Sequence, residues 1–313
     1  MRGRADGLDR LNETPGDQVD LPARADGGSR GALLRRLADL PPGHPSATRV
    51  DRDSRPDHAD DAPDRSFWEK VPRCEALWQS HLRRWPDKPA SPEEAARKDD
   101  PPGSWRGRGD QYLSPEQNAE ADQLIADLRG PEKEVTTLLK QIEQDNPHGG
   151  VLAGLEHRFK GTNRLKEKIV EKAEGDLGIG LADVTRKIND AVRYTFRFSD
   201  QDYVTGCLDV RQRLESAGCQ MFYGKNHWAD DPEYKGINTR WTTPTGGRFE
   251  LQFHTSESFY AKENLTHGSY DRLRAPDTSW QELPELEAYQ RTVSNAISKP
   301  SGIERIPDRW EGS

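Results

Sequence analysis

The first hundred residues of this chain hold too few apolar side chains to build a core of their own. Segments such as RADGGSRGALLRRLADLPPGHPS and DRDSRPDHADDAPDRS consist mostly of Arg, Asp, Pro, Gly and Ala. That composition buries too little apolar surface to offset the entropy lost on ordering the chain. We therefore expect residues 1–104 to be a polar, largely disordered region that contributes little core. Short helices are predicted at Ala32 to Leu40 and around Ser66 to Trp85, where Phe67 and Trp78 offer docking groups.

The composition of the whole chain limits its partners. Of 313 residues, 32% are hydrophobic and 32% are charged, with a net charge of -8. A protein with this charge is not expected to hold nucleic acid stably or to bind anionic membranes, so any basic site must be local. No stretch approaches eighteen apolar residues, and no apolar segment follows the first arginines, so we expect a cytoplasmic protein, with secretion by a leaderless route left open.

Helix signals begin at Ser114. Ser114, Pro115 and Glu116 form an N-cap, a first-turn proline and an acidic first turn. A second helix is predicted to open at Pro131, and both helices carry apolar residues on one face. We therefore read residues 105–150 as a helical extension that packs on the domain that follows.

From Val151 onward, strand and helix patterns alternate. This pattern predicts an α+β domain over residues 151–275, with a mixed sheet flanked by helices, and a C-terminal tail over 276–313 that forms a short helix and then becomes disordered. The predicted strands are LEHRFK, Ala191 to Phe198, Lys235 to Thr242 and Arg248 to Thr255; the predicted helices are Thr162 to Ala173, Tyr203 to Ala217 and Ser256 to Leu273.

Four basic residues stand near one predicted strand-to-helix junction. On a strand, Arg158 and Lys160 would leave the same face, and Arg164 and Lys168 are four apart on the next helix. We expect these cations to converge on a polyphosphate, aided by the helix N-terminus. The alternative is a solvated basic helix face balanced by its neighbouring glutamates. Those glutamates are Glu167, Glu171 and Glu174.

The hairpin strands carry a polar face. Glu250, Gln252 and His254 alternate with apolar residues, and a loop centred near Thr245 would place Asn238 opposite Gln252 and Arg240 opposite Glu250. Such a polar wall is either exposed to solvent or part of a binding site, and the pattern favours neither.

A second carboxylate precedes the strand that begins near Ala191. Asp190 together with Glu250 would supply the one or two carboxylates that Mg²⁺ takes beside phosphate oxygens. The alternative is that Asp190 only caps the strand.

The order of these motifs resembles the synthetase domain of the RelA/SpoT family. The segments are RFKG, RLKEK, INDAVRYTFRF, YKGIN and FELQFHT, and they extend from about Leu155 to Arg274. Members of this family transfer pyrophosphate from ATP to a nucleotide 3′-hydroxyl on a nucleotidyltransferase-like fold. The sequence is most similar to the actinobacterial nucleotide 3′-pyrophosphokinases and related toxin-like domains.

The resemblance implies a set of donor residues. Arg158 would stack on the donor adenine, and Arg193 falls on the family's strand arginine in the ATP site. Asp190 would bind Mg²⁺, and Glu250 would bind the metal or activate the attacking hydroxyl. The residues implied to hold the ATP phosphates are Lys160, Arg164 and Lys168.

The resemblance also implies an acceptor pocket. Tyr234 would stack on the acceptor purine, Lys225 would contact acceptor phosphates, and Gln252 falls on the family's glutamine. His254 replaces the arginine of the family's ExQxRT motif, and Asn238 replaces the histidine that follows the tyrosine. These two departures leave the acceptor base open.

The expected function is therefore magnesium-dependent pyrophosphate transfer from ATP to GTP, GDP, ATP, ADP or AMP, giving (p)ppGpp- or (p)ppApp-type alarmones. Asp190 stands three residues before Arg193, whereas the family's aspartate stands five before its arginine. The alternatives are a catalytically inactive module that binds a nucleotide or RNA, and the same chemistry used as a delivered toxin with a neutralising protein as its partner.

Overall fold

A computed structural model gives the arrangement of most of the chain after residue 64. It describes residues 65–86, 99–107, 111–174, 180–185, 187–229, 231–275 and 278–310. The helix predicted at Ala32 to Leu40 lies outside these residues. In the described part of the chain, no helix is both long enough and apolar enough to cross a lipid bilayer.

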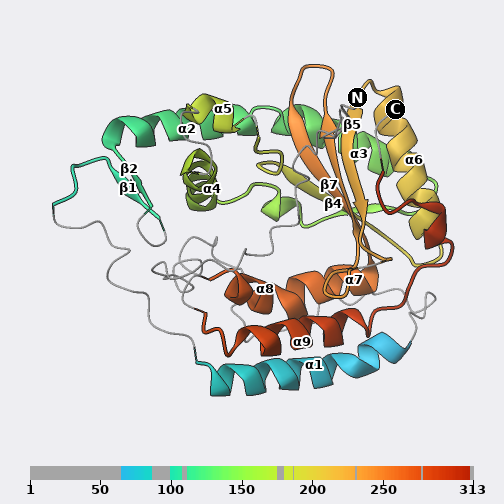
Figure 1. The fold of residues 1–313 in the computed structure, drawn as a ribbon. Coiled ribbons are helices and arrows are strands. Elements are labelled where there is room, and N and C mark those ends of the chain that lie inside the picture. The colour runs from blue at the N-terminus through green and yellow to red at the C-terminus, as the bar shows by residue number, and fades with distance from the viewer. Residues whose placement is uncertain are drawn as a thin grey trace, which may run out of the picture.

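A mixed sheet forms the centre of the molecule (Figure 1). Within the described residues it has five strands in the order β3-β4-β7-β6-β5. Strands β4 and β7 run parallel, and the other neighbours are antiparallel, as the prediction of a mixed sheet requires. The strands are β3 (Val151–Ala153), β4 (Arg193–Phe198), β5 (Gln220–Asn226), β6 (Ile237–Thr242) and β7 (Arg248–Thr255).

One face of the sheet is apolar and is covered by α3 (Glu132–Asp145) and α6 (Tyr203–Ser216). Phe196 and Phe253 stack on neighbouring strands with ring centroids 6.5 Å apart, and Leu139 of α3 is fully buried in the same cluster. Side chains alternate across a strand, so this apolar set leaves the intervening polar residues on the opposite face.

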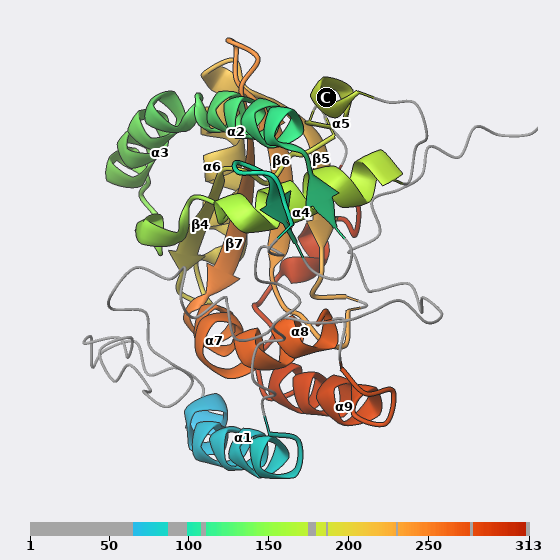
Figure 2. The same ribbon diagram turned by 90° about the vertical axis from the view of Figure 1, so that its left-hand side faces the viewer.

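Three helices lie beside the polar face: α2 (Pro115–Arg129), α4 (Thr162–Glu174) and α5 (Leu181–Thr185). They share a small core with Ala121, Leu165 and Ile169 at its centre. Ser114 caps α2 through a capping box with Gln117, which confirms the predicted helix start. In both ribbon views α4 lies between α2 and α8 (Figures 1 and 2).

A helical layer closes the end of the sheet where β4 and β7 finish (Figure 1). The predicted helix from Ser256 to Leu273 is one continuous run that contains a π-helical turn. Trp78 and Phe67 of α1 pack into this layer. The layer consists of α7 (Ser256–Tyr260), the π-helix η5 (Ala261–Thr266), α8 (His267–Leu273), α9 (Leu283–Ser294) and α1 (Arg65–Arg84).

Two further groups complete the described elements. A small hairpin, β1 (Trp105–Arg106) with β2 (Tyr112–Leu113), precedes α2. Short 3-10 turns are η4 (Leu155–His157) and η6 (Ile303–Arg305).

Three sequence-based expectations differ from the fold. LEHRFK is not a strand: Gly154 adopts φ 63°, a left-handed conformation that turns the chain into η4. Residues 1–104 do contribute core, because Phe67 is 1% exposed and Trp78 is 8% exposed. The C-terminal tail is not disordered after its helix, since Trp310 packs over the sheet and its N–H donates to Gly224 O.

Candidate functional site

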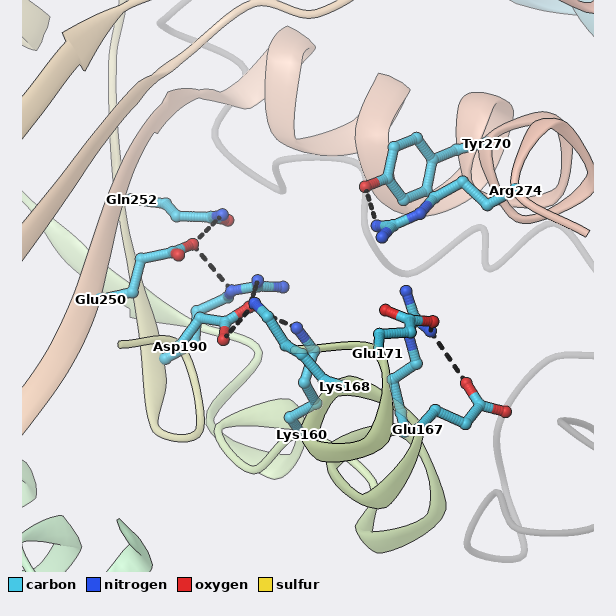
Figure 3. Close-up of polar contacts among 11 residues, drawn as sticks. Lys160, Glu167, Lys168, Glu171, Asp190, Glu250, Gln252, Tyr270 and Arg274 are labelled. Carbon is cyan, nitrogen blue, oxygen red and sulfur yellow. Dashed lines mark hydrogen bonds and ion pairs between the residues drawn. The ribbon is translucent and has the colours of Figure 1, made fainter. Parts of the chain in front are cut away.

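Asp190 lies at the centre of a basic cluster at the start of β4. Its Oδ1 is 3.0 Å from Lys168 Nζ of α4, and its Oδ2 forms an ion pair with Lys160. Arg193 Nη2 lies 3.5 Å from the same Oδ2. The backbone holds these groups in place, because Lys160 N–H donates to Ala191 O beside the strand. Figure 3 shows Lys160, Lys168 and Asp190 pointing toward one another.

The protonation of this cluster is set by burial and by the competing charges. Burial alone would raise the pKa of Asp190, but Lys160, Lys168 and Arg193 hold that pKa well below its ordinary range. Burial lowers the pKa of Lys160 to about 7, because the loss of water outweighs the attraction of Asp190. The cluster therefore keeps a fixed anion beside an ammonium group that is easily neutralised.

Glu250 joins this cluster through Arg193. The two residues are register partners on β4 and β7, and Arg193 Nε lies 2.9 Å from Glu250 Oε1. The contact is an ion pair without the geometry of a hydrogen bond, since this buried Nε has no hydrogen-bond partner among the residues that the structure describes. The negative charge of Glu250 raises the pKa of Arg193 above its ordinary value. One guanidinium thus links the two carboxylates expected to bind metal.

Gln252 orients Glu250 from the next inward position of β7. Its Nε2 donates to Glu250 Oε1 at 2.7 Å, and within the described part of the chain its own buried Oε1 has no donor. The polar wall is therefore interior, because Glu250 and Gln252 are each 5% exposed and His254 is fully buried. The predicted register is confirmed, with Asn238 opposite Gln252 and Arg240 opposite Glu250.

Arg158 and Arg164 do not join the other cations, contrary to the expectation that all four converge. The turn η4 directs Arg158 toward α3, where its Nε lies 2.6 Å from Glu132 Oε1. Arg164 Nη1 is 2.9 Å from Glu167 Oε2 and 3.3 Å from Glu171 on its own helix. The convergence was expected from a strand at residues 155–160, and this strand is absent from the described fold.

Tyr234 lies at the other end of the polar wall. Its hydroxyl is 2.9 Å from Asn238 Oδ1 and 2.9 Å from His254 Nε2. Lys225 is half-buried on β5 and pairs in register with Asn238, which in turn pairs with Gln252. The sheet thus brings the predicted acceptor residues Lys225, Asn238 and Gln252 into one row across three strands.

The carboxylates at this site are few. Among the residues that the structure describes, no three His, Cys, Asp or Glu side chains gather as metal ligands. Mg²⁺ needs only one or two protein carboxylates when phosphate oxygens complete its shell. Asp190 and Glu250 meet that need, and the donor-free Oε1 of Gln252 adds an oxygen beside them. The donor set therefore fits a magnesium ion that arrives with phosphate.

Residues that the sequence patterns did not single out also border the cluster. Tyr270 of α8 and Arg274, which follows that helix, face it from across the site (Figure 3), with Arg274 Nη1 donating to Tyr270 OH at 2.6 Å. Away from this cluster, Glu132 holds Arg158, and Ser258 Oγ lies 3.0 Å from His254 Nδ1 at the other end of the polar wall. None of these lies in a motif, and only the tertiary packing of α3, α7 and α8 brings them near.

Comparison with known proteins gives similarity to solved structures only. No protein-family model and no curated protein sequence matches the chain. The Type VI effector Tas1, solved with its immunity protein, is 20% identical, and the match covers 57% of this chain and 96% of that one at a TM-score of 0.40. The small alarmone synthetase 1 from Bacillus subtilis is 16% identical over 56% of this chain and 91% of that one, at 0.40. A GTP pyrophosphokinase family protein from Streptococcus pneumoniae is 15% identical over 58% and 90%, at 0.38.

Proposed function

We propose that this protein transfers pyrophosphate from ATP to the 3′-hydroxyl of a purine nucleotide. One observation carries the proposal: Asp190 and Glu250 are linked by Arg193, while Lys160 and Lys168 stand beside Asp190. Two carboxylates serve a metal and an attacking hydroxyl, and adjacent cations serve a polyphosphate. The order of motifs from RFKG to FELQFHT, which resembles the RelA/SpoT synthetase domain, supports the same chemistry.

The donor is ATP, held through its phosphates. When ATP binds, Lys160 and Lys168 exchange part of their contact with Asp190 for contacts with phosphate oxygens. A triphosphate offers more oxygens and more negative charge than a single carboxylate. Arg158 keeps its guanidinium 4.8 Å from the centre of the Phe159 ring, and its ion pair with Glu132 steadies it for the adenine. Arg164 reaches the phosphates only after it leaves Glu167 and Glu171.

Asp190 and Glu250 would hold Mg²⁺ together with the ATP phosphates. The ion supplies charge neutralisation at the transferred group. Arg193, which pairs with both carboxylates, would have its guanidinium beside the ion and the nucleotide phosphates. Gln252 orients Glu250 through a hydrogen bond that lies within the protein.

The reaction forms one bond and breaks one bond. The acceptor 3′-oxygen attacks the β-phosphorus of ATP, the bond between that phosphorus and the α,β-bridging oxygen breaks, and AMP leaves. Glu250 accepts the proton of the 3′-hydroxyl. The protein's main contribution is to position the reactants and to stabilise charge on the pyrophosphoryl group.

The acceptor is a purine nucleotide stacked on Tyr234, with its phosphates near Lys225. A stacking platform accepts adenine and guanine alike. We therefore include GTP, GDP, ATP, ADP and AMP among the acceptors.

The test is a transfer assay with Mg²⁺, ATP labelled on its γ-phosphate and a panel of unlabelled purine nucleotides. We expect the label to move to the acceptor and AMP to appear in equal amount, with EDTA abolishing both. Release of labelled phosphate with ADP, or nucleotide binding without any AMP, would contradict the proposal. The second outcome would favour a nucleotide-binding module.

A further inference from the structure

The ring of Tyr234 is fixed by partners on three sides. Its hydroxyl lies between Asn238 Oδ1 of β6 and His254 Nε2 of β7, each at 2.9 Å. The ring edge also meets the His227 ring, with centroids 5.0 Å apart at 88°, and the His254 ring at 5.5 Å and 85°. Such edge-to-face contacts favour one ring orientation.

The hydroxyl of Tyr234 has little hydrogen-bonding capacity left for a ligand. A phenol has one proton to donate, and burial keeps the pKa of Tyr234 well above its ordinary value, so this proton is retained. Burial also holds the pKa of His254 well below its ordinary value, so the ring is neutral with one donor and one acceptor nitrogen. If Tyr234 donates to Asn238, then His254 donates to Tyr234. The proton of the phenol and a lone pair are then both engaged.

His254 is itself held in place. Its Nδ1 lies 3.0 Å from Ser258 Oγ, which also accepts the N–H of Thr255, the N-cap residue of α7. The His254 side chain is fully buried, whereas an atom that reads a nucleotide base must be reachable from the pocket. Both nitrogens of His254 are therefore engaged with the protein.

The main chain at Tyr234 is fixed as well. Asp231 Oδ1 accepts the N–H groups of Glu233 at 2.9 Å and Tyr234 at 3.0 Å, and Asp231 Oδ2 lies 2.8 Å from His227 Nδ1. Gly236 allows the close approach above it: a Cβ there would meet His254 Cε1 at 2.8 Å and Tyr234 OH at 3.0 Å. The segment is built around the tyrosine hydroxyl.

We infer that Asn238 and His254 are positioning residues that hold the Tyr234 ring as a preformed stacking surface, and that neither contacts the acceptor base. This inference rests on the proposed function, in which Tyr234 receives the acceptor purine. It changes the role expected from the family resemblance, where both positions belong to the acceptor site. Base discrimination must then come from other groups, because a stacking face is shared by adenine and guanine.

The test is a double-mutant cycle read by calorimetric affinity for GDP and for ADP, which requires no turnover. We expect Tyr234→Phe to weaken both nucleotides by about three- to tenfold, the effect of one hydrogen bond. Asn238→Ala should weaken nucleotide binding by a similar factor. The double variant should bind no more weakly than either single variant, because both changes remove the same hydrogen bond that holds the Tyr234 ring. His254→Gln, which keeps a polar group near the Nε2 position, should stay closer to the wild type than His254→Leu.

Tyr289→Phe is the matched control. That phenol is also buried, but it donates to Leu265 O within the helical layer, so its loss should leave nucleotide affinity unchanged. Thermal melting of each variant reports whether the fold is kept.

Effects of Tyr234→Phe and Asn238→Ala that multiply in the double variant would overturn the inference. So would an Asn238 or His254 variant that weakens GDP and ADP by clearly different factors. A wild type that binds neither nucleotide would overturn the proposed function itself, and the two failures are therefore distinguishable.

Discussion

Arg193 and Glu250 stand opposite each other on parallel strands and form an ion pair with 2.9 Å between Nε and Oε1. The side chain of Glu250 is 7% exposed, so its charge depends on this pair and on Gln252 for compensation. A buried carboxylate held between an arginine and a glutamine is already oriented before any nucleotide arrives. That geometry is the basis of the first prediction.

Glu250→Gln should abolish pyrophosphate transfer while ATP affinity stays within about tenfold of the wild type. The change removes the proposed proton acceptor and metal ligand, but it leaves the phosphate contacts proposed for Lys160 and Lys168. Transfer is measured by AMP release and affinity by calorimetry. Glu215→Gln is the control, because Glu215 pairs with Arg211 on α6, across the sheet. Full activity in Glu250→Gln would refute the mechanism.

ATP binding at pH 8 should take up protons, because the pKa of Lys160 is about 7 and a bound polyphosphate favours its ammonium form. At pH 6 most of Lys160 is already protonated, so the uptake should be smaller. The uptake is measured from the dependence of the calorimetric enthalpy on the ionisation heat of the buffer. Lys160→Met should lose this proton uptake. Lys140 is an exposed lysine on α3, so Lys140→Met should keep it.

Asp190→Asn should lower the free energy of unfolding at pH 7 by about 3 kcal/mol, because it leaves buried cations without their anion. The stabilisation by Asp190 depends on pH because folding depresses the pKa of this carboxyl. Its contribution to the free energy of unfolding is complete above the ordinary pKa of 3.8 and is lost as the pH falls through the pKa in the folded state. Denaturant unfolding at pH 7 and pH 3 measures both effects. A variant as stable as the wild type would show that the cluster does not depend on Asp190.

Removal of residues 1–86 should destabilise the fold by at least about 3 kcal/mol, because Phe67, Val71 and Trp78 leave the helical layer. The buried hydrogen bond between His81 Nε2 and Glu282 Oε1, 2.9 Å apart, is lost as well. Deletion of residues 1–64 is the matched control, since it keeps α1. Equal melting temperatures of the two truncated proteins would contradict a core role for α1.

Tyr234→Ala should lower the transfer rate with adenine and guanine acceptors by similar factors. The lost interaction is the shared stacking, worth about 1 to 3 kcal/mol per base. Rates with ADP and GDP at fixed ATP measure the two factors. If only guanine acceptors lost activity, or if the wild type ignored adenine nucleotides at millimolar concentration, a base-reading contact must lie elsewhere.

The hairpin shows what could be predicted from the sequence. Alternation in RFELQFHT and YKGIN and a short loop between the strands fix which residues face each other, so the pairs of Asn238 with Gln252 and Arg240 with Glu250 followed directly. The α2 cap at Ser114 and the helices α4 and α6 are equally local in origin.

The errors arise where distant segments decide the structure. Strand β5 is not predicted from the sequence because its partner on one side is the C-terminal segment: a Cβ at Gly224 would lie 2.5 Å from Trp310 Cβ. The separation of Arg158 from Lys160 depends on the left-handed Gly154 and on Glu132, twenty-six residues earlier in the chain than Arg158. No local pattern carries either contact.

The π-helical turn at Ala261–Thr266 sets the rotational phase of the helix that follows it. A π turn holds about one residue more than an α turn, and successive α-helical residues point about 100° apart. Loss of one residue there would rotate α8 as a rod, so Tyr270 would swing away from the site and Leu273 would leave its packing against the α1 layer. The number of residues in this turn therefore governs both surfaces of α8, and we expect a length change here to be far more damaging than one in the exposed hairpin loop.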